Sequence, residues 1–165
     1  MTLAAGRRWK ATLSAAATAL AVAGLGALST DLGGWYQALK QPGWKPPDWA
    51  FGPIWTVIFA LTALAGLKAL DAAPDRRARR LILAALLLNG VLNILWSLLF
   101  FRLRRPDWAL VEVGFLWASV ALLIVVLGRH SRTAGVLLVP YLVWVSLAAA
   151  LNAAVVRLNG PFGGG

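Results

Sequence analysis

The stretch WYQALKQPGWKPPDWAFGPIW, residues 35–55, holds four of the nine tryptophans and four of the eight prolines of the chain. Pro42, Pro46 and Pro47 each lack an amide donor, and each pushes the residue before it out of helical geometry. A continuous helix through this stretch is therefore excluded, although apolar segments flank it on both sides. We expect a stiff, partly polyproline-like loop over about residues 30–50 that displays flat aromatic rings. Such a loop is typical of a lid rather than of a simple connection.

The composition around this loop is that of a polytopic membrane protein. The chain is 60% hydrophobic and 13% charged, with a mean hydropathy of +0.73, whereas soluble domains carry about 45–50% apolar and about 25% charged residues. The apolar residues are gathered into five long runs that consume most of the chain. We therefore predict an all-α integral membrane protein, a five-helix transmembrane bundle forming one domain over residues 1–165. The expected helices cover about residues 9–29, 51–70, 81–101, 107–127 and 133–157.

The first run also has an alternative interpretation. Basic residues precede it and small residues end it, as in a cleaved secretory signal. Its length of about twenty residues is enough to cross a bilayer, and alanines recur at Ala15, Ala19 and Ala23, which favours close helix packing. We retain it as the first helix.

The net charge of +10 comes from basic residues clustered at the ends of apolar runs. This placement is typical of contact with anionic headgroups and of topology control, and it excludes a nucleic-acid-binding domain of the usual kind. Ten basic residues fall on the amino-terminal side and six on the other, which favours a cytoplasmic amino terminus, with the aromatic loop outside. The ten are Arg7, Arg8, Lys10, Lys68, Arg76, Arg77, Arg79, Arg80, Arg129 and Arg132, and the six are Lys40, Lys45, Arg102, Arg104, Arg105 and Arg157.

Metal and thiol chemistry have no residues to support them. The chain has no cysteine, which excludes disulfides, thiol nucleophiles and thiolate metal sites. The one histidine, His130, lies in a basic turn between two apolar runs, so a buried cluster of metal ligands cannot be built. We expect no resident cofactor.

Two helical stripes mix amide and aromatic side chains. Asn89, Asn93 and Trp96 recur at i, i+4 and i+7, and Tyr141, Trp144, Ala148 and Asn152 recur at i, i+3, i+7 and i+11. These faces can line a pocket for a flat amphiphilic ligand. Alternatively, the asparagines only hold helices together, at about 0.6 kcal/mol each. The spacing alone leaves both interpretations open.

Glu112 is the one acid well inside an apolar run. Intramembrane acids are functional candidates, for example in proton-coupled transport. The alternative is an interfacial carboxylate that reaches towards Arg102, Arg104 or Arg105, because Glu112 lies only about 8 Å along the helix from the expected membrane edge.

The pattern W-Y-x-x-L-x-x-P-x-W-x-P-P-x-W-x-F-G-P-x-W-T, from Trp35 to Thr56, resembles the signature of the TspO/MBR family. This is the family of the tryptophan-rich sensory proteins and of translocator proteins, also known as peripheral-type benzodiazepine receptors. The resemblance continues in Asn93-Ile94-Leu95-Trp96-Ser97, in Val139-Pro140-Tyr141-Leu142-Val143-Trp144, in Leu151-Asn152 and in Arg157-Leu158-Asn159.

The resemblance implies a five-helix bundle, often a homodimer, with a ligand cavity roofed by the first loop. It implies porphyrins such as protoporphyrin IX as ligands, with sterols in some members and light-dependent porphyrin breakdown in others. Carried over by motif position, the ligand-binding residues are Tyr36, Trp44, Phe51, Trp55, Asn89, Asn93, Trp96, Trp144 and Ala148.

Three positions depart from the family pattern. Gly43 replaces a second adjacent tryptophan of some bacterial relatives, and Phe59 replaces a frequent tyrosine. Ala153 stands where the sterol pattern near Arg157 needs an aromatic residue, which argues against sterol.

Three functions follow as hypotheses. The first is a membrane binding protein, sensor or carrier for porphyrins, in which Lys40 or Lys45 meets propionates at the rim. The second is light-dependent porphyrin degradation with Trp44 and Trp55 as redox residues, since no acid–base or nucleophilic constellation is present. The third is an exporter of amphipathic molecules that uses Glu112. Binding without enzyme activity is favoured over degradation, and the exporter ranks third because Glu112 is shallow and solitary.

Overall fold

The computed structural model describes residues 33–162. The predicted helix over about residues 9–29 and the first residues of the predicted loop lie outside this range. The described elements are α2 (Gly34–Ala38), α3 (Asp48–Ala72), α4 (Arg76–Ser97), the π-helix η1 (Leu98–Arg102), α5 (Pro106–Gly128), α6 (Arg132–Leu137) and α7 (Val139–Asn159).

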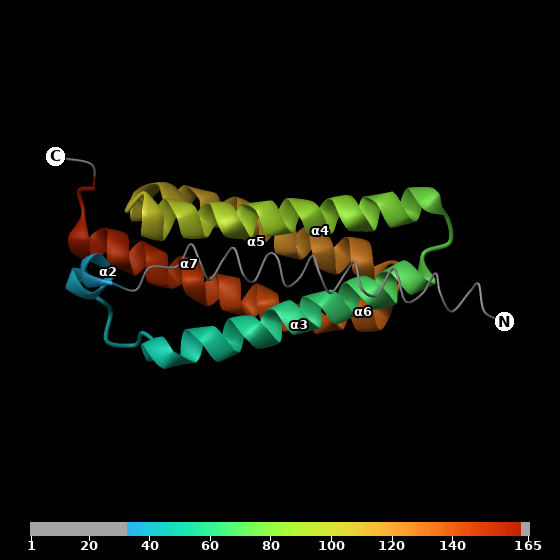
Figure 1. Ribbon diagram of the computed structural model, residues 1–165, viewed down its shortest axis with the longest axis horizontal. Helices are drawn as coiled ribbons and strands as arrows, with labels where there is room; N and C mark the ends of the chain where they lie inside the picture. The colour runs from blue at the N-terminus through green and yellow to red at the C-terminus, as the bar shows by residue number, and fades with distance from the viewer. Residues whose placement is uncertain (1–32, 163–165) are drawn as a thin grey trace.

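The helices form an elongated bundle (Figure 1). Four segments are long and apolar enough to cross a membrane, namely Asp48–Ala72, Arg76–Arg102, Pro106–Gly128 and Arg132–Asn159. α5 packs against both α4 and α7, and its Leu116, Val120, Leu123 and Leu127 are almost fully buried. Residues 33–162 contain no strand. The predictions of an all-α fold and of a membrane protein are confirmed.

The amino-terminal end of α4 differs from the prediction. The expected helix starts at about residue 81, but α4 already begins at Arg76. Asp75 caps it, because its Oδ1 accepts a hydrogen bond of 2.8 Å from the amide of Ala78. Arginine is a good helix former, and Arg79 also donates to the carbonyl of Leu70 at 2.8 Å, near the end of α3. The charged residues 76–80 are therefore the first turn of a spanning helix.

α3 also begins earlier than predicted, at Asp48 instead of about residue 51. Pro47 takes the position before the helix, and its carbonyl accepts from the amide of Ala50 at 2.9 Å. Pro53 consequently falls in the second turn rather than the first. The carbonyl of Trp49 loses its helical partner there, at a residue whose side chain is 77% exposed.

The last membrane segment is interrupted near Pro140, as expected of a proline inside a helix. α6 ends at Leu137, and Leu138 joins it to α7 with φ −91° and ψ −9°. The short α6 packs closely on the end of α5. A Cβ placed on Gly135 would lie only 3.1 Å from the Cα of Gly128.

Candidate functional site

At one end of the bundle, α2 and the segment after it meet the long helices (Figure 1). Residues of these elements line a small cavity. Its volume is about 40 Å³, room for about one water molecule, whose share of liquid volume is about 30 Å³. Aromatic and small apolar residues line most of it, with a few polar side chains between them. The lining residues are Tyr36, Gln41, Lys45, Phe51, Trp96, Phe100, Phe101, Ala148, Leu151, Asn152 and Val155.

The π-helix η1 supplies two of these rings. Phe100 and Phe101 are both buried although they are adjacent in sequence, and the ring centroids lie 4.8 Å apart. The amide of Leu103 bonds the carbonyl of Leu98, five residues back, at 2.9 Å. Such wider turns inside helices are frequent at functional sites. The turn brings consecutive aromatic side chains to one cavity.

Several buried polar atoms at and beside the cavity find no hydrogen-bond partner among residues 33–162. They are the Nε2 of Gln41, the indole Nε1 of Trp96 and of Trp144, and the Oδ1 of Asn152. Buried polar groups in proteins are nearly always paired, and each orphan costs about 1–3 kcal/mol. Three of these four atoms are donors, so the site favours a ligand that carries acceptors.

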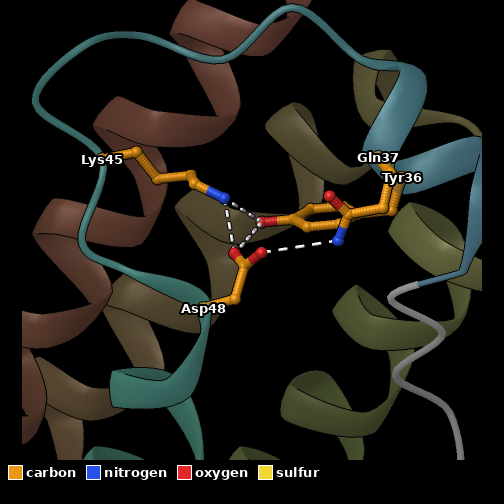
Figure 2. Close-up of polar contacts among 4 residues, drawn as sticks. All are labelled: Tyr36, Gln37, Lys45 and Asp48. Carbon is orange, nitrogen blue, oxygen red and sulfur yellow. Dashed lines mark hydrogen bonds and ion pairs between the residues drawn. The ribbon is translucent and has the colours of Figure 1, made fainter.

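Tyr36, Lys45 and Asp48 hold the loop closed around this cavity (Figure 2). The Nζ of Lys45 lies 2.5 Å from Oδ1 of Asp48 and donates to the Tyr36 hydroxyl at 3.2 Å. The Tyr36 hydroxyl and Nε2 of Gln37 each donate to Asp48 at 3.4 Å. Burial raises the pKa of the Tyr36 phenol. Burial alone would lower the pKa of Lys45, but the hydrogen bonds to Asp48 and Tyr36 outweigh it and raise the pKa.

The same loop is tied to the far end of α7. The amide of Lys40 donates to Oδ1 of Asn159 at 2.7 Å, and Nδ2 of Asn159 donates back to the carbonyl of Lys40 at 2.9 Å. The segment 39–47 is thus anchored at both ends, to α7 by Asn159 and to the start of α3 by Asp48.

Four of the predicted ligand residues line the cavity: Tyr36, Phe51, Trp96 and Ala148. Trp144 and Trp55 lie next to them, because Trp144 contacts Phe51 edge-on with ring centroids 5.5 Å apart and Trp55 at 6.4 Å. Trp44 does not line the cavity, and its side chain is 53% exposed.

Asn89 and Asn93 are buried and bridge helices instead of lining the cavity. The Nδ2 of Asn89 on α4 donates to Oγ of Ser119 on α5 at 2.9 Å. The Nδ2 of Asn93 donates to the Tyr141 hydroxyl on α7 at 3.2 Å. These bonds are those expected of residues that hold helices together, while their contact with a ligand stays a prediction.

Glu112 is buried in α5, only 6% exposed, and neither carboxylate oxygen finds a partner among the described residues. The expected interfacial pairing with Arg102, Arg104 or Arg105 is wrong. Arg105 instead pairs with Asp107 at the start of α5, whereas Glu112 points inward, one and a half turns further along the helix.

Residues that the sequence patterns missed are Gln41, Phe100, Phe101, Leu151 and Val155. No periodicity reveals Phe100 and Phe101, because a regular helix would separate the directions of two neighbouring residues. Leu151 and Val155 on α7 are ordinary residues for a membrane helix, and only the tertiary structure shows that they line the cavity.

A second, larger hollow lies between α3 and α7, with a volume of about 530 Å³. It is lined only by apolar and aromatic side chains, and Trp144 also belongs to the aromatic cluster beside the small cavity. Its lining residues are Pro53, Ile54, Val57, Ile58, Val139, Pro140, Val143, Trp144 and Leu147. We refer to it as the α3–α7 groove.

Comparison with known proteins identifies the family. The model of the TspO/MBR family matches residues 14–158. The tryptophan-rich protein TspO of Chlorobaculum tepidum is 36% identical over 125 residues, which cover 76% of this chain and 79% of that protein. The tryptophan-rich sensory protein of Cereibacter sphaeroides is 35% identical over 76% of this chain and 77% of its own length. The translocator protein of Homo sapiens is 30% identical over 79% and 78%. With four helices able to cross a membrane and these relatives, the chain is an integral membrane protein that belongs to the TspO/MBR family.

Proposed function

We propose that this protein binds porphyrin-like tetrapyrroles inside the membrane, as a sensor or carrier, in the cavity beneath residues 39–47. The observation that carries the proposal is the combination of aromatic walls with buried donors that lack partners. A flat macrocycle with polar edges complements both, because its faces can stack on rings and its edges can accept hydrogen bonds.

Binding requires the loop to move. A cavity of about 40 Å³ is far below the roughly 300–1,000 Å³ of ordinary ligand pockets. The loop is the element that can move, since side chains of Asp48 and Asn159 tie it down at its two ends. The ligand therefore enters as these contacts open, and Tyr36, Lys45 and Gln41 return to its edge.

Titration of the purified protein with protoporphyrin IX, followed by quenching of tryptophan fluorescence, tests this proposal. Trp96→Phe keeps a ring but removes an indole N–H that has no partner within residues 33–162, so we expect about two- to tenfold weaker binding. Trp49→Phe is the matched control, because Trp49 is 77% exposed, and its affinity should equal that of the wild type. Absence of saturable binding, or equal losses in both variants, would sink the proposal.

Light-dependent degradation is the enzymatic form of the same proposal. Of the two candidate redox residues, Trp55 is the better placed, since it contacts Trp144 and Tyr141, whereas Trp44 is half exposed. Illumination of the complex in the presence of oxygen should yield a defined product, and the yield of this product should be lower for Trp55→Phe. Unspecific bleaching in both proteins would count against catalysis.

The α3–α7 groove favours a second candidate function, binding of a sterol or lipid chain. Its volume of about 530 Å³ lies within the usual range of ligand pockets, and its lining is apolar apart from the indole N–H of Trp144, which has no partner among residues 33–162. A fluorescent sterol should bind the wild type and lose affinity in Val143→Phe, which fills the groove. Val125→Phe on α5, at a residue 51% exposed, is the control; equal effects of the two would rule the groove out.

Export across the membrane is a separate hypothesis that rests on Glu112. Glu112 is a buried acid without a partner in the described part of the chain, and buried acids are the kind of group that proton-coupled transporters use. Glu112→Gln should then abolish ligand transport into proteoliposomes and leave ligand binding unchanged. Equal transport by both proteins would remove this hypothesis.

We also propose a fifth spanning helix over about residues 9–29, a cytoplasmic amino terminus and a homodimer. The family resemblance supports the first and third. The excess of basic residues on the amino-terminal side supports the second. This excess depends on Arg7, Arg8 and Lys10, because residues 33–162 carry seven basic residues on that side and six on the other. Cysteine labelling from either side of the membrane and mass measurement in detergent test these proposals.

A further inference from the structure

We propose that Lys45 and Gln41 form a subsite for a carboxylate of the ligand. In the absence of ligand, the Asp48 carboxylate pairs with the ammonium of Lys45, and the ligand carboxylate displaces Asp48 when it binds. This inference rests on the proposed function and specifies which ligands the site selects, namely anionic macrocycles with carboxylate arms.

The polar chemistry at this edge of the cavity matches a carboxylate. Lys45 and Gln41 both line the cavity, and the buried Nε2 of Gln41 has no partner among residues 33–162. An ammonium and a free amide N–H₂ are both donors, and an ionised carboxylate is purely an acceptor with about four sites. A ligand carboxylate would satisfy Gln41 as well as Lys45.

Asp48 already shows how an anion binds here (Figure 2). Its carboxylate makes one short contact, 2.5 Å to Lys45, and two long ones of 3.4 Å to Tyr36 and Gln37. Displacing it therefore breaks one strong charge-assisted bond, and an incoming carboxylate restores that bond.

Asp48 can also leave the pair without being stranded. Its side chain is 35% exposed and begins a helix, where the macrodipole and the free amides favour a negative charge. Water and the helix end thus compensate the released carboxylate. The contact is an internal competitor of the ligand as well as a fastening of the loop.

The test compares protoporphyrin IX, which has two propionates, with its dimethyl ester, which has the same ring and no carboxylate. We expect Lys45→Met to weaken binding of the diacid about tenfold and to leave the ester within twofold. Asp48→Asn should tighten the diacid several-fold more than the ester, because opening of the loop helps both ligands and release of Lys45 helps only the diacid. Added salt should weaken the diacid only.

Lys68→Met is the matched control, because Lys68 is an exposed lysine near the other end of α3, far along the helix from Asp48. It should bind both ligands like the wild type, and all variants must keep the wild-type melting temperature within a few degrees. If Asp48→Asn changes diacid and ester equally, Asp48 only fastens the loop and the inference is overturned. The inference is also overturned if Lys45→Met changes the affinities for the diacid and the ester equally. If the wild type binds neither ligand, the proposed function itself fails.

Discussion

Asn159, near the carboxyl end of α7, forms a pair of hydrogen bonds with the backbone of Lys40, more than a hundred residues earlier in the chain. The side-chain amide satisfies both the N–H and the C=O of one loop residue, as a neighbouring strand would. The residue 39–47 segment is thereby joined to the last spanning helix.

Asn159→Ala should loosen this segment without unfolding the bundle. Loss of two hydrogen bonds frees the backbone at Lys40, and we expect faster tryptic cleavage after Lys40 and faster hydrogen exchange of residues 36–45. Cleavage after Lys45 stays slow in any case, since Pro46 follows it. Ser146→Ala, which removes a hydroxyl bonded within the membrane region, is the control. Unchanged rates of tryptic cleavage and hydrogen exchange in Asn159→Ala would contradict the role of Asn159 in holding this segment.

Gly135→Ala should destabilise the packing of α6 on α5. The new Cβ would lie 3.1 Å from the Cα of Gly128 and 3.3 Å from the carbonyl oxygen of Ile124, and overpacking of this kind costs about 1–3 kcal/mol. Gly114→Ala on α5 is the matched control, because nothing among the described residues lies within 4 Å of its added Cβ. The free energy of unfolding in mixed micelles should fall for Gly135→Ala alone. Equal stabilities of the two variants would contradict the close approach of Gly135 to Gly128.

The bond from Asn93 to the Tyr141 hydroxyl should appear as a coupling in a double-mutant cycle. Asn93→Ala, Tyr141→Phe and the double variant measure it, and we expect about 0.6 kcal/mol, within a range up to about 1.7 kcal/mol. The measurement is again the free energy of unfolding in mixed micelles. Strictly additive losses would show that the 3.2 Å contact contributes nothing.

Glu112→Gln should not lower the stability of the protein. Both carboxylate oxygens are buried without a partner among the described residues, so the substitution removes no bond and replaces an ionisable group by a neutral one of similar shape. We expect a melting temperature at or above that of the wild type. Leu116→Ala on the same helix, which empties a site only 1% exposed, is the contrasting control and should lose about 2–5 kcal/mol.

Much of the bundle follows from composition and periodicity. Apolar runs of twenty residues predict spanning helices wherever they occur, and three of the four described helices begin within three residues of the expected positions. The α4 start was misplaced because arginines look like a turn, whereas the Asp75 cap makes them a first helical turn. The break before α7 lies next to Pro140, because a proline inside a helix removes an amide donor and clashes with the preceding turn.

By itself, the sequence determined the class of fold, a proline-rich interruption placed at about residues 30–50 and the rings available to a ligand. That Gly34–Ala38 within this stretch form the short helix α2 was not predicted. Period and composition carry that information, because a bilayer admits few backbone solutions. Only the tertiary structure decided which polar groups are satisfied. Asn89 and Asn93 bond to Ser119 and Tyr141. The buried donors of Gln41, Trp96 and Trp144 have no partner among residues 33–162, and Trp44 is half exposed. Hydrogen-bond partners far apart in the chain have no periodicity, so no local pattern predicts them.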